Sequence, residues 1–213
     1  MAQAPEETKR RGDSPERFDR WSERYEDSFL WRHYFTPVHE MLVSRIGDVS
    51  GLAVLDLGCG TGDLLRWLAH RGAARTVGVD FSNGMLDVAR NLAGDTATDF
   101  IQASAESIPL GDREFDIVTS CIAFHHFPDP EGTFREAARV LRGGGRLILC
   151  DPTREGIASR LLLLIGRITD TDRHYFDRSS ISELAREAGF EVSEVEIVRR
   201  FPRLMLLTAV KPE

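Results

Sequence analysis

Residues 54–65, VLDLGCGTGDLL, decide the fold. An apolar segment that is interrupted only by Asp56 runs into three glycines, Gly58, Gly60 and Gly62, and a helical pattern begins immediately after them. Glycine lets the backbone turn tightly and approach a ligand closely, and such a loop between a strand and a helix is typical of a βαβ unit. The stretch therefore predicts a parallel α/β sheet with a ligand site at the glycine loop.

Short apolar segments and amphipathic helical patterns alternate on both sides of this loop. The expected strands are residues 52–57, 76–79, 99–102, 116–119, 146–149, 191–198 and 204–210. Helical patterns separate the first five, which indicates a parallel sheet with helices on both faces. The last two are expected to be antiparallel closing strands at the edge of the sheet. The sequence thus predicts a doubly wound, mostly parallel sheet of about seven strands with flanking helices.

Helical patterns also precede and follow this core. Residues 14–25 and a segment from Thr36 to Gly47 suit two short amphipathic helices, and residues 157–168 suit a very apolar one. Ser180 and Glu183 predict a capping box for a further helix. We expect one domain of 213 residues with three parts: N-terminal lid helices (1–47), a ligand-binding core (48–152), and a substrate-side helix with closing strands (153–213).

Composition excludes several classes of function. The chain has 27 Lys and Arg against 34 Asp and Glu, a net charge of −7, which argues against nucleic acid as a partner. Its three cysteines, Cys59, Cys121 and Cys150, are too few and too far apart for a disulfide framework or a zinc site. The apolar segments are far shorter than the ~20 residues that span a bilayer, and residues 1–18 contain no apolar run, so we expect no secretory signal. We expect a cytoplasmic monomer or homodimer with no metal and no membrane span.

The glycine spacing indicates which cofactor binds. A dinucleotide fingerprint needs glycine where this chain has Asp63. Asp56 and Asp63 are expected to place negative charge at the mouth of the loop, which repels a pyrophosphate and suits a ligand with an ammonium group and no phosphate. S-adenosylmethionine (SAM) is such a ligand. Asp80 ends the next strand and is placed to bind ribose hydroxyls, although it could also cap the helix that begins near Ser82.

Five ordered motifs within residues 52–152 resemble a known family. They are VLDLGCGTG, VGVDFSNGML, QASAESIPL, FDIVTSCIAFHHFPDP and ARVLRGGGRLILCDP. The chain resembles the class I SAM-dependent methyltransferases, in the small-molecule branch similar to the ubiquinone and menaquinone C-methyltransferases (methyltransferase type 11-like). The resemblance implies a Rossmann-like fold with an N-terminal helical lid, SAM as cofactor and S-adenosylhomocysteine as product.

The residues themselves and the resemblance together give the candidates for a cofactor site. They are Tyr25, Asp56, Gly58, Cys59, Gly60, Gly62, Asp80, Phe81, Met85, Ser104, Ala105, Glu106 and Cys121. Ser104 stands where the family usually has an aspartate that accepts from the adenine amine, so a weaker neutral acceptor replaces a charged one. Tyr25 is expected to close over the methionine end of SAM, or else to be a core aromatic. Phe81 and Met85 could offer apolar surface to the adenine, or could simply belong to the core.

Three residues after strand ends are candidates for the chemistry. Methyl transfer is an in-line displacement that can require removal of a proton from the acceptor. His125, His126 and Asp151 all lie at the carboxyl edge of the expected sheet, and histidine, with an ordinary pKa near ~6.5, suits a base at neutral pH. The two histidines could instead cap a helix or line the site. His33 and His174 are weaker candidates.

Three functions remain after this reading. The first is transfer of a methyl group from SAM to a small, apolar or aromatic metabolite. The second is a SAM-binding protein with lost or non-methylating activity. The third, a nicotinamide-dependent oxidoreductase, is opposed by Asp63 and by the absence of a Tyr-x-x-x-Lys motif. Residues 120–123, SCIA, also lack the N/D-P-P-Y motif of enzymes that methylate adenine or amide nitrogens.

Overall fold

The computed structural model describes residues 35–156, 159, 173–198 and 203–213 of the chain. The helical patterns at residues 14–25 and 157–168 fall wholly or largely outside these ranges, and so do Tyr25 and His33. The expectations for those segments stay predictions.

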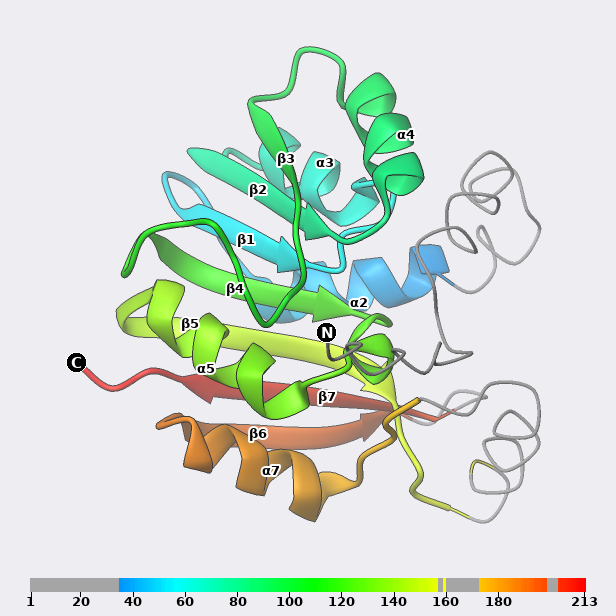
Figure 1. Cartoon of the computed structure of the whole chain (residues 1–213), viewed down its shortest axis with the longest axis vertical. Coiled ribbons are helices and arrows are strands. Elements are labelled where there is room, and N and C mark those ends of the chain that lie inside the picture. Colours follow the sequence, from blue (N-terminus) through cyan, green and yellow to red (C-terminus); the bar gives the residue numbers. More distant parts are fainter. Residues whose placement is uncertain (1–34, 157–158, 160–172, 199–202) are drawn as a thin grey trace, which may run out of the picture.

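A seven-stranded sheet runs through the described part of the chain (Figure 1). The strands are β1 (Ala53–Leu57), β2 (Arg75–Asp80), β3 (Thr98–Gln102), β4 (Phe115–Cys121), β5 (Leu141–Pro152), β6 (Glu191–Val198) and β7 (Leu204–Val210). Their order in space is β3-β2-β1-β4-β5-β7-β6, and β7 runs antiparallel to both of its neighbours while the other pairs are parallel. The predicted doubly wound, mostly parallel α/β fold is confirmed.

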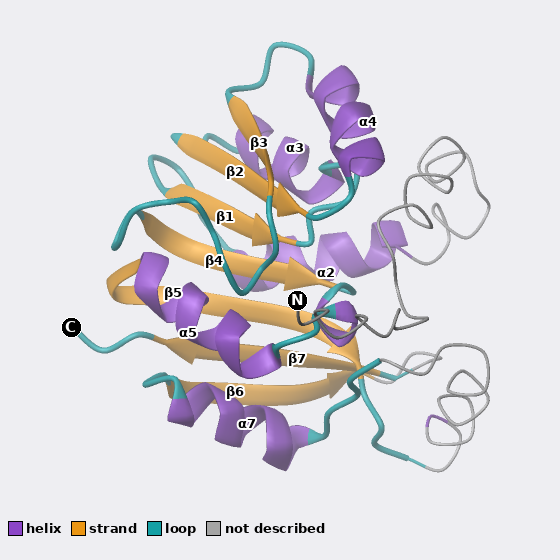
Figure 2. Cartoon of the chain, viewed as in Figure 1, coloured by secondary structure: helices purple, strands orange, loops and turns teal. Residues whose placement is uncertain are grey.

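Helices cover both faces of this sheet (Figure 2). One face carries α2 (Thr36–Ile46), α3 (Asp63–His70) and α4 (Asn83–Ala93), and the other carries α5 (Pro130–Val140) and α7 (Arg178–Glu187). A short 3₁₀ turn, η2 (Phe124–His126), follows β4. Because helices cover both faces, every residue of β1 is buried, which explains its nearly continuous apolar sequence.

The helix α2 is part of the layered fold. Proline lies in its first turn and Gly47, with φ of +77°, ends it, as the sequence predicts. Its buried side chains, which include Leu42 and Ile46, pack in one cluster with Val54 of β1 and Leu68 of α3. The end of the segment assigned to lid helices therefore packs against the sheet.

The cap of α7 differs from the sequence prediction. The N-cap is Asp177, three positions before Ser180, and the two side chains each bond the other's backbone N–H. The Ser180–Glu183 capping box is therefore wrong: Ser180 occupies the third helical position, where its hydroxyl closes the box begun by Asp177. A carboxylate and a hydroxyl can both cap a helix, so the sequence pattern alone does not decide whether Asp177 or Ser180 is the N-cap.

Candidate cofactor and acceptor site

The glycine loop lies where the strand order reverses. The chain proceeds from β1 outward to β2 and β3, then returns to the other side of β1 with β4, and ligands of open α/β sheets bind at such a crevice. Gly58, Gly60 and Gly62 have φ between 53° and 76°, in the left-handed region that favours glycine. A Cβ at Gly60 would meet no atom of the described residues within 4 Å, so none of these residues fills this side of the loop.

Asp80 holds the open side of this loop. Its Oδ2 accepts from Gly60 N at 2.9 Å, and its Oδ1 accepts from Ser82 N at 2.9 Å. Burial raises the pKa of Asp80, and these backbone bonds oppose the shift. The N-cap of α4 is Ser82, whose hydroxyl accepts from Met85 N, so the carboxylate of Asp80 is not the cap.

Neither acidic residue predicted for the mouth carries an unpaired charge there. Asp63 bonds His39 of α2 and Arg66, and although burial opposes ionisation these partners lower its pKa. Asp56 is 2% exposed and accepts from Thr119 Oγ1 at 2.7 Å, and burial raises its pKa to about 7. Both carboxyl groups therefore have hydrogen-bond partners from α2, α3 or β4, and their effect on the choice of ligand stays a prediction.

The segment expected to read the adenine follows β3 directly. Ala103 N donates to Asp80 O, which ties this segment to the end of β2. Ser104 begins a tight turn in which its carbonyl accepts from Ser107 N, and Ala105 is buried. Glu106 Oε2 is buried and has no hydrogen-bond partner within the described ranges.

The remaining cofactor candidates differ in burial. Phe81 is half-buried, whereas Met85 is almost fully buried in α4. Cys59 lies in the glycine loop, close to Gly78 of β2, and burial raises the pKa of its thiol well above the ordinary value. Cys121 ends β4 opposite Cys150 of β5, and the hydrogen bond with Cys150 and burial raise its pKa.

The catalytic candidates meet at the ends of β4 and β5. His125 Nδ1 and Asp151 Oδ1 are joined by a hydrogen bond of 2.9 Å, and both side chains are buried. Burial raises the pKa of Asp151 well above its ordinary value; the charge of His126 and backbone N–H groups of η2 oppose the shift. Asp151 Oδ2 is buried with no hydrogen-bond partner in the described part of the chain. The structure brings the three predicted residues together, and their catalytic role stays a prediction.

Residues 173–176 complete this group, and sequence reasoning missed most of them. The Tyr175 ring stacks on His125 with centroids 5.4 Å apart, and the charge of Arg173 acts on Asp151. His174, a weaker candidate from the sequence, is exposed and donates its backbone N–H to the carbonyl of His125 at 2.9 Å. The one signal for this contact is the aromatic stretch DRHYF, which the sequence does not link to η2.

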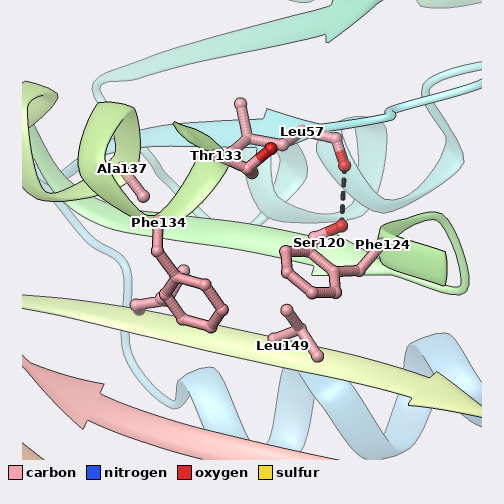
Figure 3. A pocket seen from close by; sticks show the side chains of 8 residues that line it. Leu57, Ser120, Phe124, Thr133, Phe134, Ala137 and Leu149 are labelled. Carbon is pink, nitrogen blue, oxygen red and sulfur yellow. Dashed lines mark hydrogen bonds between the residues drawn. The ribbon is translucent and has the colours of Figure 1, made fainter. Parts of the chain in front are cut away.

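A small cavity lies on the α5 face of the sheet, behind the site (Figure 3). Its volume is about 10 Å³, near the minimum that holds one water molecule. Its lining is mostly apolar, and the hydroxyl of Ser120 is already bonded to Leu57 O at 2.9 Å. This cavity is therefore a packing defect and is too small for a cofactor or an acceptor.

The cofactor edge fits a SAM-sized ligand in two respects. The space beside Gly60 is not filled by any described residue. Thr61 Oγ1, within the loop, is buried without a hydrogen-bond partner among the described residues, and such an atom costs free energy unless water or a ligand bonds it. Among these residues no group of three or more His, Cys, Asp or Glu side chains could hold a metal ion, and no helix is long and apolar enough to cross a membrane.

Comparisons with known proteins show which family the chain belongs to. Residues 55–149 match the family model described as "Methyltransferase domain". The ubiquinone biosynthesis O-methyltransferase of Pseudomonas aeruginosa (strain LESB58) is 32% identical over 187 residues, which cover 83% of this chain and 80% of that protein. The demethylmenaquinone methyltransferase of Clavibacter sepedonicus is 34% identical over 167 residues, 68% of each chain.

Solved structures share the fold. A chain from the complex between the Haloferax volcanii Trm112 methyltransferase activator and a methyltransferase superposes with a TM-score of 0.82 at 23% identity, covering 92% of this chain and 98% of that one. The magnesium protoporphyrin IX methyltransferase of Synechocystis PCC 6803, solved with bound S-adenosylhomocysteine, gives a TM-score of 0.72 at 24% identity and covers 92% and 94%. The sheet order agrees with this family, and two relatives share more than 30% of their residues with this chain over at least two thirds of their length. The chain therefore belongs to the class I SAM-dependent methyltransferases of the small-molecule type.

Proposed function

We propose that this enzyme methylates a small apolar or aromatic acceptor and that His125 removes the acceptor's proton. One observation carries the proposal: a buried His125–Asp151 pair at the carboxyl edge of β4 and β5, with the ring of Tyr175 stacked on the imidazole. A histidine held by a carboxylate through one nitrogen is a typical arrangement for a general base.

The cofactor residues divide by the part of SAM that each would bind. Main-chain groups of Gly58, Gly60 and Gly62 would lie along the cofactor, and Asp80 would accept from its ribose hydroxyls. Residues 104–106 and Phe81 would contact the adenine. Asp56, Cys59 and Cys121 are candidates for the methionine end, where the prediction also places Tyr25. SAM supplies a methyl group on a positively charged sulfur.

Asp151 would act on the acceptor through His125. With Asp151 ionised, a hydrogen bond from His125 Nδ1 to Asp151 Oδ1 would fix the ring orientation and leave Nε2 to accept the proton. The two side chains are 5% and 2% exposed, so water competes little for the proton. His126 lies close enough to Asp80 and Asp151 to lower the pKa of both carboxyl groups when it is protonated, so it lies between the cofactor edge and the acceptor edge.

The surroundings of this pair favour an apolar or aromatic acceptor. The half-buried ring of Tyr175 stacks on the imidazole of His125, with centroids 5.4 Å apart, so two planar rings lie face to face here. A planar apolar molecule gains most from such walls, because aromatic rings add stacking to the burial of area. The matched relatives from Pseudomonas and Clavibacter are named for ubiquinone biosynthesis and demethylmenaquinone, which supports the same class of acceptor.

A labelled-methyl screen tests the proposal. Purified enzyme is incubated with SAM that carries a labelled methyl group and with a metabolite extract, and mass spectrometry identifies the products that gain the label. Hydroxylated quinones and phenols form one defined panel; amino acids and nucleosides form the other. We expect label in the first panel together with release of S-adenosylhomocysteine. Label confined to the second panel, or none in either, would overturn the proposed acceptor class.

A further inference from the structure

The glycine loop is supported from behind by Arg66. Three glycines with positive φ make this loop costly to order, so its bonded contacts decide how well it is preformed. On the β2 side, Gly58 N and Cys59 N both donate to Val79 O. On the α3 side, Arg66 Nη1 donates to Thr61 O at 2.6 Å, which fixes the last turn of the loop before the helix begins.

Asp63 connects this arginine to a histidine on another helix. Asp63 Oδ1 accepts from Arg66 Nη2 at 3.1 Å, while a bond of 2.9 Å joins its Oδ2 to His39 Nδ1. The histidine side chain is 7% exposed and the aspartate 13%. The contacts run in series from α2 through the first residue of α3 to the carbonyl of Thr61.

The ionised form of Asp63 depends on both of its partners, His39 and Arg66. Burial disfavours the ionised form of Asp63, and the partners His39 and Arg66 outweigh it, so the pKa is lowered. Removal of one partner leaves a buried charge less compensated, and the carboxylate must then move toward water or another donor. The ring of His39 also packs edge-on against Trp67, centroids 6.2 Å apart, which limits where the imidazole can lie.

We propose that His39 is a positioning residue for cofactor binding. It holds Asp63 and, through Arg66, the Thr61 carbonyl in the geometry that the cofactor loop needs, without itself contacting SAM. Because α2 is anchored in the core by Leu42 and Ile46, the imidazole relays the position of that helix to the loop. The inference rests on SAM binding at the glycine loop and adds a residue 19 positions before it.

The two amide variants of His39 separate this role from simple packing. The amide nitrogen of Asn lies near the position of Nδ1, whereas that of Gln reaches the position of Nε2. We expect His39→Gln to raise the Kd of SAM about tenfold, equivalent to ~1.4 kcal/mol, with kcat at saturating SAM and the acceptor KM unchanged. His39→Asn is expected to stay within about threefold of the unchanged protein. His70→Gln, on the exposed end of α3, is the matched control and should leave the Kd unchanged.

Calorimetry with SAM, together with a thermal-unfolding check on each variant, decides the outcome. Equal losses in His39→Asn and His39→Gln, or no loss in either, would overturn the relay. Arg66→Gln provides a second route if a His39 variant fails to fold: it should weaken SAM binding by itself and make a further His39→Gln change nearly silent, and additive losses would contradict the proposal. An unchanged protein that fails to bind SAM would overturn the cofactor site itself.

Discussion

The cofactor edge and the acceptor edge of the sheet are built differently. At the ends of β1 and β2 the main chain does most of the work: glycines with positive φ, backbone N–H groups and one carboxylate, Asp80. At the ends of β4 and β5 the site is formed by side chains: His125 from η2, Asp151 from β5 and Tyr175 from the segment that precedes α7. The first edge needs a particular backbone path, and the second needs particular functional groups.

This difference predicts how each edge responds to change. A backbone-built site binds one cofactor shape and tolerates side-chain replacement as long as the loop keeps its path. A side-chain-built site loses its chemistry with a single substitution, and its acceptor can change while the cofactor stays. The binding of SAM and the rate of methyl transfer should therefore respond to different sets of substitutions, and four predictions test that separation.

The largest effect is expected at His125. Replacement by Gln or Ala should lower kcat by roughly 10²–10⁴, because a proton transfer is lost, while the Kd of SAM stays near normal. The pH–rate profile should lose the inflection that a base imposes. His174→Gln, an exposed neighbour whose contact with His125 is through its backbone, is the control. If His125 variants keep turnover and pH dependence, catalysis at this edge is positioning alone and Asp151 is tested next.

The second effect concerns stability at the cofactor edge. Burial raises the pKa of Asp56 from 3.8 to about 7, so between these values the folded protein binds a proton that the unfolded chain releases. The stability that this proton contributes is complete below about pH 4 and lost as the pH rises to about 7. The Asn side chain of Asp56→Asn does not titrate. As the pH rises from about 4 to about 7, the free energy of unfolding of this variant should therefore rise relative to that of the unchanged protein, by up to a few kcal/mol.

Urea unfolding of the two proteins at several pH values measures this difference. The gap between them should widen from pH 4 to about 7 and then level off. Thr119 can still donate to the Asn oxygen, so the hydrogen bond itself is kept. A gap that does not change with pH would mean that Asp56 is ionised throughout.

The third effect concerns SAM affinity. Asp80→Ala should weaken binding by about 1.5–3 kcal/mol, since bonds to a carboxylate are lost and Gly60 N loses its acceptor. Calorimetry with SAM, and with NAD as a ligand that should not bind, measures it. Asp87→Ala, on the exposed side of α4, is the control. Unchanged affinity in folded Asp80→Ala would leave the loop geometry as the sole determinant of the cofactor edge.

The smallest effect is a helix cap next to the acceptor edge. Asp177 accepts from Ser180 N at 3.0 Å, so Asp177→Ala should cost about 1 kcal/mol of folding free energy. Asp177→Ser, which retains a capping oxygen, should recover most of the loss. Thermal unfolding at neutral pH distinguishes the two, and equal stability of all three proteins would show that α7 is held by packing alone.

The sequence predicted the cofactor edge in more detail than the acceptor edge. All seven strands were identified, because the apolar pattern and glycine loops are local signals. The family, SAM and the methyltransferase activity are also confirmed, and the oxidoreductase alternative is wrong. His125 and Asp151 could be named as candidates because each follows a strand. The hydrogen bond between them could not be predicted, because the two residues are 26 positions apart in the sequence. The partners of Asp63 and the stack of Tyr175 depend on packing between distant segments, which no local pattern encodes.

The insertion of β7 between β5 and β6 has a consequence for synthesis of the chain. The ribosome makes β6 before β7, but β6 has no neighbour other than β7 in the sheet. Until β7 emerges, β5 is a bare edge whose backbone groups can pair with any extended chain, and β6 has nothing to join. If the chain folds in the order of its synthesis, β1 to β5 with the cofactor loop would pair first and the β7–β6 hairpin would join the acceptor side last. A chain released before β7 is made would carry an exposed, aggregation-prone edge beside Asp151.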